Sequence, residues 1–409
     1  MSPGMKFGIF LEMQMPRPWE DETEHRVLHE VLEQVELADR LGIQYAWEVE
    51  HHFLEEYSHS SAPEVFLAAA SQRTSRIRLG HGIVQLPSNV NHPARVAERI
   101  ATLDLLSDGR VELGTGEGTG AVEPAGFGVD YTTKREQWRE SLDAITRMFV
   151  EEPFRGYDGR WLQMPERNVV PKPYQKPHPP LWVAAPRPDV IPVAAQHGLG
   201  ALCFSMLIEP EQAREWVDGY YAVLESDDCV PAGFSVTPEL AVVTGLMCHD
   251  DEQTALDRGL EGAHFLAFSL SHYYNHGDTH AHGRSRLWDD FERDRAAVGF
   301  DRARFNGASL VATYDRKNSY AQRGAIGTPD QIRDFLRRYE DAGCDQVILF
   351  SQVGHNRHED ICESLELFGR TVLPEFAERD EARTARKRER LAPAIERALA
   401  RREPAFASS

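Results

Sequence analysis

The stretch Thr328–Phe350, TPDQIRDFLRRYEDAGCDQVILF, joins a helix pattern to a strand pattern. Thr328 and Gln331 have the N-cap to N3 spacing of a capping box, and a proline stands at the first helical position. The helix is expected to stop at Gly343, and the apolar run Gln346–Phe350 has the length of a buried strand. A buried strand so soon after a helix is typical of an α/β protein with a parallel sheet.

The same alternation runs through the rest of the chain. The expected strands are Lys6–Leu11, Gln44–Val49, Arg76–Leu86, Arg110–Gly114, Leu181–Ala185, Ala201–Phe204, Glu239–Met247 and Gln346–Phe350. Helical patterns separate them, among them Arg26–Leu41, Pro63–Ser71, Pro93–Leu106, Lys134–Val150, Asp189–His197 and Pro210–Leu224. Eight such units in 409 residues predict a closed parallel TIM (β/α)8 barrel rather than an open doubly wound sheet.

Two connections are too long for ordinary loops, and they are expected as insertions at about 115–180 and 249–326 of a single barrel domain, 1–377. Long insertions after barrel strands lie on the catalytic face, so the histidine-rich Ser271–Gly299 is predicted to act as a mobile lid. The remainder, 378–409, is rich in Ala, Arg and Glu without a strong apolar stripe. It is predicted to be a charged helical tail that is exposed or lies between subunits.

Charge and composition limit the partners. A formal charge of −20 argues against nucleic acid and anionic membranes, which favour basic surfaces. No run of 18 apolar residues and no signal-peptide pattern is present. The five cysteines show no CxxC spacing, which fits reduced thiols in the cytoplasm.

The second expected strand ends in EHHF, Glu50–Phe53, where a barrel strand carries catalytic residues. A metal site, an acid–base site and a solvated loop are all compatible with this composition. A shared ion is awkward, because His51 and His52 would point to opposite faces of an extended segment. His280 and His282 have better metal-ligand spacing but lie within a polar insertion, so no metal is predicted. Glu55 and Glu56 are expected to form a solvated rim.

Two further stretches are compatible with a phosphate-bearing cofactor. GTGEGTG, Gly114–Gly120, allows backbone to approach a planar or anionic ligand, although Glu117 would repel phosphate. At Arg187–Asp189 a cation meets the predicted start of a helix, which favours an anion. A surface turn is an equally good interpretation of Arg187–Asp189 alone.

Taken together, these segments resemble the bacterial luciferase-like monooxygenases, a family of flavin-dependent barrels. The resemblance covers nearly the whole chain. Its segments, in order, are MKFGIF (Met5–Phe10), WEVEHHF, LGHGIVQLPSNVNHPARVAERIATLDLLSDGRVELGTGEG, TTKREQW, PKPYQKPHPPLWVAA, AAQHGLGALCFS and the Gly327–Phe350 stretch.

The resemblance implies roles for individual residues. His51 corresponds to the histidine that performs acid–base work beside the flavin, and His52 is structural. Gly82–Ile83 corresponds to a non-proline cis peptide beneath the flavin ring, and Arg135 to a phosphate-contacting arginine. The implied cofactor-binding set is Glu50, Gly82, Ile83, Gly116, Glu117, Gly118, Arg135, Ala185, Pro186, Arg187 and Ser205.

This chain departs from the family pattern at two places. Glu117 stands where the family often has an arginine, and Pro186-Arg187 stands where it often has a Ser/Thr phosphate ligand. Arg187 together with Arg135 is therefore expected to hold the phosphate. The alternative is weak binding, or a different cofactor such as a deazaflavin.

The implied activity is a two-component monooxygenase. Reduced FMN would come from a separate flavin reductase, and O2 would add at flavin C4a to give a peroxide that oxygenates a small organic substrate. A homodimer is implied as well. The alternatives are a deazaflavin-dependent dehydrogenase on the same barrel, or a flavin-binding protein without catalysis.

Overall fold

The computed structural model describes residues 5–118, 120–204, 210–275, 285–297 and 323–402. Eight parallel strands close into a barrel in the order β1-β2-β3-β4-β7-β8-β9-β11, and β9 and β11 complete the ring back to β1. Their bounds are β1 Lys6–Leu11, β2 Tyr45–Glu48, β3 Arg78–Gln85, β4 Val111–Gly116, β7 Leu181–Ala184, β8 Gly200–Cys203, β9 Leu240–Cys248 and β11 Gln346–Phe350. The predicted TIM barrel is confirmed.

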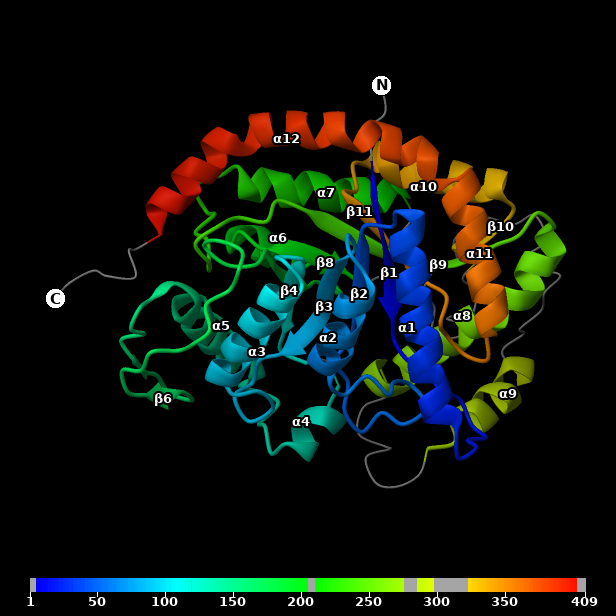
Figure 1. Cartoon of the computed structure of the whole chain (residues 1–409), viewed down its shortest axis with the longest axis horizontal. Helices are drawn as coiled ribbons and strands as arrows, with labels where there is room; N and C mark the ends of the chain where they lie inside the picture. The colour runs from blue at the N-terminus through cyan, green and yellow to red at the C-terminus, as the bar shows by residue number, and fades with distance from the viewer. Residues whose placement is uncertain (1–4, 119, 205–209, 276–284, 298–322, 403–409) are drawn as a thin grey trace.

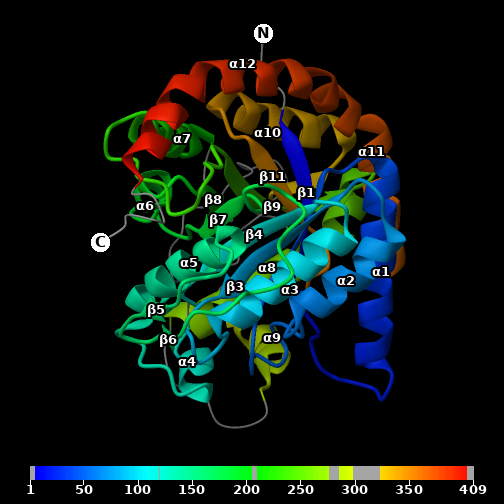
Figure 2. The same ribbon diagram turned by 60° about the vertical axis from the view of Figure 1, so that its left-hand side comes forward.

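Helices surround this barrel (Figures 1 and 2). They are α1 Thr23–Leu41, α2 Pro63–Arg73, α3 Pro93–Leu106, α4 Val122–Gly126, α5 Lys134–Val150, α6 Ile191–Gln196, α7 Pro210–Leu224, α8 Glu252–Asn275, α9 Leu287–Ala297, α10 Pro329–Ala342, α11 His358–Thr371 and α12 Leu373–Arg401. The capping box before α10 is present, and Gly343 ends the helix in the left-handed conformation with φ 93°. Local sequence signals therefore set this helix–strand unit as expected.

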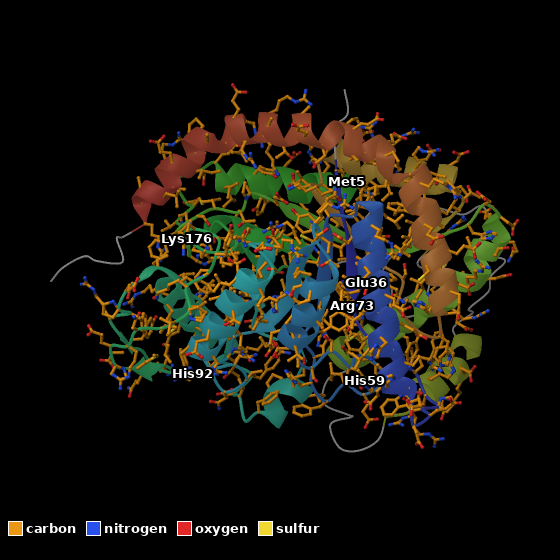
Figure 3. All side chains as sticks on the ribbon, viewed as in Figure 1. Met5, Glu36, His59, Arg73, His92 and Lys176 are labelled. Carbon is orange, nitrogen blue, oxygen red and sulfur yellow. The ribbon has the colours of Figure 1, made fainter. Side chains whose placement is uncertain are left out.

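The amino end of the barrel is covered by α12, which arches across it in Figures 1 and 2. Figure 3 shows Met5 beside α12 and His59, which follows β2, at the opposite end. Buried Asp345, just before β11, accepts hydrogen bonds from Arg383 (3.2 Å) and Lys387 (2.8 Å) of α12. Leu391, Ala394 and Ala398 are buried on one face of α12, whereas the other described residues of the tail are exposed or half-buried, so the expected exposed helix packs on the barrel through one face only.

Charged pairs fill the interior of the barrel near its amino end. Lys6 contacts Glu239 at 2.7 Å, and Arg78 pairs with Glu112. Trp182 also donates to Glu112, at 2.6 Å. Each carboxylate has a cation at ion-pair distance, which is what makes its burial tolerable.

The two predicted insertions carry their own structure. The first contains α4, α5 and a short hairpin, β5 Tyr157–Asp158 with β6 Gln163–Met164. The second contains α8 and α9 and ends at β10 Ala325–Gly327, which pairs with the end of β9. Of the predicted lid Ser271–Gly299, 276–284 and 298–299 lie outside the described residues, as do His280 and His282.

Among the described helices, none is long and apolar enough to cross a membrane. All five cysteines are free, and four of them are buried.

Candidate active site

His51 lies just past the carboxyl end of β2, between two carboxylates that come from other elements. Its Nδ1 is 3.3 Å from Glu123 Oε1, and its Nε2 is 3.7 Å from Glu12 Oε1. Glu12 follows β1, and Glu123 belongs to α4. Both carboxylate side chains are fully buried, whereas the imidazole of His51 is 16% exposed. The barrel thus brings three titratable groups together at its mouth, with the histidine facing outward.

The carboxylates set the charge of His51. Burial lowers its pKa, but Glu123, and then Glu12 and Glu50, outweigh burial and raise the pKa to about 9. Burial would raise the pKa of Glu123, but His51, the His52 N–H and Gln85 lower it below its usual range. At neutral pH the pair is therefore an imidazolium beside a carboxylate.

Glu12 behaves differently from Glu123. Burial raises its pKa to about 8, against the opposing effects of His51 and of the Ser58 and Tyr57 hydroxyls. Within the described residues, neither of its carboxylate oxygens makes a hydrogen bond of ordinary geometry. A buried and incompletely satisfied acid at a barrel mouth is a candidate functional group.

Glu50 does not face the same space, because the neighbouring loops occupy its carboxylate. It accepts hydrogen bonds from Gln85 N (2.8 Å), Asn91 Nδ2 (2.7 Å) and His52 Nε2 (3.0 Å). Its backbone carbonyl and Glu123 both accept from the Gln85 amide, at 3.0 and 2.7 Å. Glu50 therefore positions the segment that carries His51.

The two histidines diverge, as the sequence predicts: His51 faces Glu123 and Glu12, and His52 faces Glu50. Phe53, the next residue, has φ 66° and is 58% exposed. Met13, directly after Glu12, has φ 52°. Non-glycine residues in this region are costly, and here two of them follow the candidate acid–base residues.

The expectation that Glu55 and Glu56 form a solvated rim is wrong for Glu56, whereas the Glu55 side chain is 30% exposed. Glu56 is fully buried and accepts hydrogen bonds from the backbone N–H groups of Leu287 (2.8 Å) and Trp288 (3.1 Å) at the start of α9. Glu55 accepts from Arg17 at 2.7 Å. Carboxylates stabilise a helix N-terminus, so these acids hold the second insertion against the loop after β2.

The resemblance implied a cis peptide at Gly82–Ile83, and this is also wrong. The cis bonds in the described chain are four X-Pro bonds, and β3 instead has a register shift between His81 and Val84. A bulge redirects the strand without the ~3–4 kcal/mol that a non-proline cis bond costs. Gly82 and Ile83 are both partly exposed at this bulge.

The end of β4 packs against this bulge. A Cβ on Gly116 would lie 2.7 Å from Ile83 Cδ1, and one on Gly118 would lie 2.7 Å from Gln85 Oε1. Gly118 also has φ 74°, which favours glycine. The glycines of this loop therefore let the end of β4 pack closely against the Ile83 and Gln85 side chains of β3.

Basic residues gather beyond that loop. Arg135 lies 3.4 Å from Glu117, with its side chain 51% exposed. Arg187 pairs with Asp189 at 3.0 Å and is 61% exposed, and Glu117 also contributes to raising its pKa. Lys134 is 6% exposed, and its Nζ donates to Gly118 O at 2.6 Å. The structure thus brings Glu117, Arg135 and Arg187 to one rim and adds a buried lysine.

The predicted helix start at Arg187–Asp189 is misplaced. α6 begins at Ile191 and has six residues, so Arg187 lies in the preceding turn. A proline at the second position of α6 explains the shift, because it favours the first turn of a helix. Ala185 is buried in the sheet, Pro186 is exposed, and Ser205 lies outside the described residues.

No cluster of three His, Cys, Asp or Glu side chains suited to a metal ion occurs in the described part of the chain.

Comparison with known proteins places this chain in a family. The model for the luciferase-like monooxygenases matches residues 5–346, and the chain belongs to this family. It is 25% identical over 379 residues to the oxygenase component of a flavin-dependent trigonelline monooxygenase from Acinetobacter baylyi, covering 91% of this chain and 96% of that protein. It is also 26% identical over 355 residues to an F420-dependent glucose-6-phosphate dehydrogenase from Amycolatopsis mediterranei, covering 83% and 92%.

Solved structures agree with the fold. A monooxygenase from Streptomyces bottropensis superimposes with a TM-score of 0.71 at 26% identity, covering 91% of this chain and all of that one. The oxygenating constituent of 3,6-diketocamphane monooxygenase from Pseudomonas putida, in complex with FMN, has a TM-score of 0.66 at 20% identity, covering 91% and 99%. The chain therefore has a luciferase-like barrel, in a family whose members use more than one flavin-type cofactor.

Sequence reasoning missed Glu12, Glu123 and Lys134. Glu12 carried a usable signal, because it directly follows a strand at the catalytic face, just as Glu50–Phe53 does. Glu123 and Lys134 lie within the first insertion. The helix Lys134–Val150 is predicted there, but its pattern does not show which neighbour its first side chain meets. Only the path of that insertion brings Glu123 to His51.

Proposed function

We propose that this protein is an FMN-dependent monooxygenase of the two-component type. The observation that carries the proposal is the imidazole of His51, held between Glu123 and Glu12 at the mouth of the barrel. Its raised pKa, about 9, keeps it protonated at neutral pH, so it can donate a proton to a bound reactant.

The residues at the mouth fit a flavin. Gly82 and Ile83 are partly exposed at the bulge of β3, and Gly116 packs directly against Ile83. A planar ring system needs an accessible surface of this kind. Arg135 and Arg187 lie at the adjoining rim, and guanidinium groups suit a phosphate. We assign the phosphate to these two arginines and the ring to the surface formed by Gly82, Ile83 and Gly116.

Reduced FMN, when bound, would supply the electrons that activate O2. The residues of this chain then donate protons. His51 holds a proton on each ring nitrogen. Glu123 orients Nδ1, and Nε2 lies on the side of Glu12. Glu12, with a pKa of about 8, holds a second exchangeable proton within the same group. The hydrogen bonds from Leu287 and Trp288 to Glu56 hold the start of α9 against the loop that carries His51.

A deazaflavin-dependent dehydrogenase is the second candidate. The similarity to the F420-dependent dehydrogenase supports it, and so does the acid–base pair, which would serve hydride transfer to or from a substrate carbon equally well. The cofactor decides between the two functions.

Equilibrium titration of the full chain with FMN and with F420, each oxidised and reduced, is the deciding experiment. We expect reduced FMN to bind more tightly than any other form, and O2 consumption to depend on an organic substrate. Tight binding of F420 with no binding of reduced FMN would establish the second candidate. Binding of neither cofactor would refute both.

The proposed partners follow from the same assignment. A separate flavin reductase is supported by relatives described as an oxygenase component and an oxygenating constituent. A homodimer is supported by exposed apolar side chains on α2 and α3: Val65 is 67% exposed, Leu105 43% and Leu106 52%. The free cysteines support a cytoplasmic location. Analytical ultracentrifugation tests the dimer directly.

A further inference from the structure

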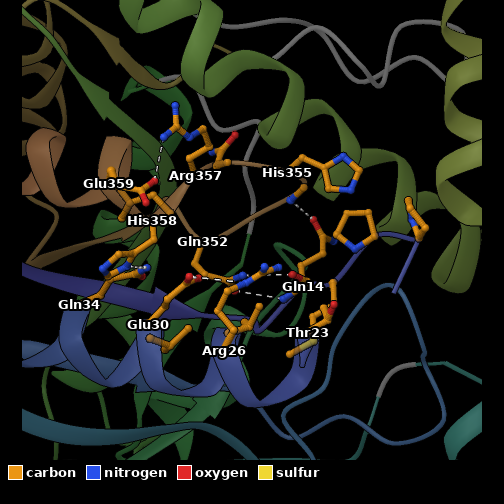
Figure 4. A pocket seen from close by; sticks show the side chains of 18 residues that line it. Gln14, Thr23, Arg26, Glu30, Gln34, Gln352, His355, Arg357, His358 and Glu359 are labelled. Carbon is orange, nitrogen blue, oxygen red and sulfur yellow. Dashed lines mark hydrogen bonds and ion pairs between the residues drawn. The ribbon is translucent and has the colours of Figure 1, made fainter. Parts of the chain in front are cut away.

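A separate pocket of about 350 Å³ lies between the first half of α1 and the segment that leads from β11 into α11 (Figure 4). The candidate active-site residues do not line it. Amides, imidazoles and charged groups form much of its wall, including Gln14, Arg26, Gln34, Gln352, Arg357 and His358. The volume is that of a small-ligand site, and so polar a wall calls for a polar ligand.

Gln14 gives the first indication of what binds. Its side chain is 1% exposed, and its Oε1 accepts a hydrogen bond from Gly354 N at 2.7 Å. That bond fixes the orientation of the amide, so the remaining atom is the nitrogen. Nε2 has no hydrogen-bond partner within the described chain. A buried donor of this kind needs an acceptor, which an oxygen atom of a ligand in the pocket would supply.

Two helices begin at this pocket. Thr23, the first residue of α1, and His358, the first residue of α11, both line it. The N-cap residues Glu22 and Arg357 make no side-chain capping hydrogen bond. First-turn N–H groups without caps, together with the helix dipole, favour a negatively charged group.

Two arginines line the same pocket. Arg26 is 57% exposed and lies 3.7 Å from Glu30, and Arg357 is 69% exposed and lies 3.3 Å from Glu359. Such exposed ion pairs contribute little to stability, so either guanidinium can leave its glutamate and bind a ligand instead. Glu30 and Glu359 also line the pocket, which adds acceptors for donor groups on the same ligand.

We propose that this pocket binds a small polar molecule that carries a carboxylate or phosphate group, at a site distinct from the barrel mouth. Its anionic oxygens accept from Gln14 Nε2, Arg26 and Arg357. Gln14 lies two residues after Glu12, and Met13 between them has φ 52°. Occupation of the pocket therefore restrains the segment that positions Glu12.

Isothermal titration of the full chain with succinate and with inorganic phosphate tests this site. We expect saturable binding of at least one anion, weakened roughly tenfold or more by Arg26→Ala or Arg357→Ala, the loss expected for one hydrogen bond to a charged group. Arg40→Ala and Arg370→Ala are matched controls, because these arginines are exposed on α1 and α11 away from the pocket. Binding in both controls should equal that of the unaltered chain.

Two results would overturn the proposal. One is the absence of saturable binding for both anions. The other is binding that survives Arg26→Ala and Arg357→Ala but is lost in Arg135→Ala, which would place the anion at the rim of the barrel mouth. Which of succinate and phosphate binds more tightly distinguishes the two ligand chemistries. The first result leaves the FMN proposal untouched, and the second would place the anion at the rim that we assign to the cofactor phosphate, so the two proposals fail separately.

Discussion

Charged side chains lie at both ends of the barrel, but their pairing differs between the two ends. At the amino end Lys6 pairs with Glu239, and Glu112 is shared by Arg78 and Trp182. At the mouth, Glu12 is fully buried without a hydrogen bond to its carboxylate from any described residue. Charges paired at short distance serve the fold, whereas a buried acid whose carboxylate makes no hydrogen bond of ordinary geometry is a candidate for chemistry.

The largest expected effect is on activity and comes from the mouth. His51→Gln removes the proton donor, so oxygenation of any substrate that the unaltered protein turns over should fall ~10²–10⁴-fold. Its free energy of unfolding should fall as well, by about 3 kcal/mol at neutral pH, because the buried Glu123 carboxylate loses its charged partner. Activity by steady-state kinetics and stability by denaturant titration check both statements. His52→Gln is the matched control, and an equal loss of activity there would contradict the assignment.

The next effect belongs to the amino end and is on stability. Arg78→Met leaves Glu112 buried without its cation and should lower the free energy of unfolding by about 3 kcal/mol, at the low end for a broken buried pair because Arg78 is 28% exposed. Arg95→Met breaks a comparable but exposed pair with Glu98 and should cost at most about 1 kcal/mol. Urea denaturation of the two variants side by side measures the difference. Equal losses would mean that the amino end is no more dependent on its ion pairs than the surface is.

A smaller effect is expected on the affinity of the barrel mouth for FMN. If Arg187 contacts the cofactor phosphate, Arg187→Ala should weaken FMN binding by about 1.5 kcal/mol, the low end for a hydrogen bond to a charged group at so exposed a side chain. Riboflavin, which lacks the phosphate, should bind the variant and the unaltered chain alike. Fluorescence titration with both ligands makes the test. Parallel losses would refute a phosphate contact.

The smallest effect concerns pH. Because Glu123 raises the pKa of His51, Glu123→Gln should move that pKa from about 9 toward or below the ordinary value of 6.5. A raised pKa stabilises the fold below the unfolded value, near 6.5, and that contribution is lost as pH rises through about 9. The variant should therefore be less stable than the unaltered chain at pH 6 and approach it above pH 9. Histidine NMR titration and unfolding midpoints across this range measure both, and an unshifted His51 would break the proposed pairing.

Local patterns in the sequence predicted the framework because they act within a few residues. The capping box at Thr328, the stop at Gly343 and the buried run Gln346–Phe350 are all present as expected. The position of His51 followed from the same logic, since a residue just past a barrel strand must lie at the mouth. His52 turns away because successive side chains of an extended segment point to opposite sides.

Long-range contacts decided the rest. Glu12 and Glu123 are separated from His51 by 39 and 72 residues, so their approach depends on the closure of the barrel and on the path of the first insertion. From the sequence, Glu56 is expected to be a surface acid. In the structure it caps the start of α9, which is distant in the sequence. The charged tail packs because Asp345 is buried at the barrel's amino end and needs Arg383 and Lys387. The sequence by itself determined the barrel and the place of His51, because periodicity and turn chemistry are local. The tertiary structure alone decided which charges meet and which remain unsatisfied, because those depend on segments that only folding brings together.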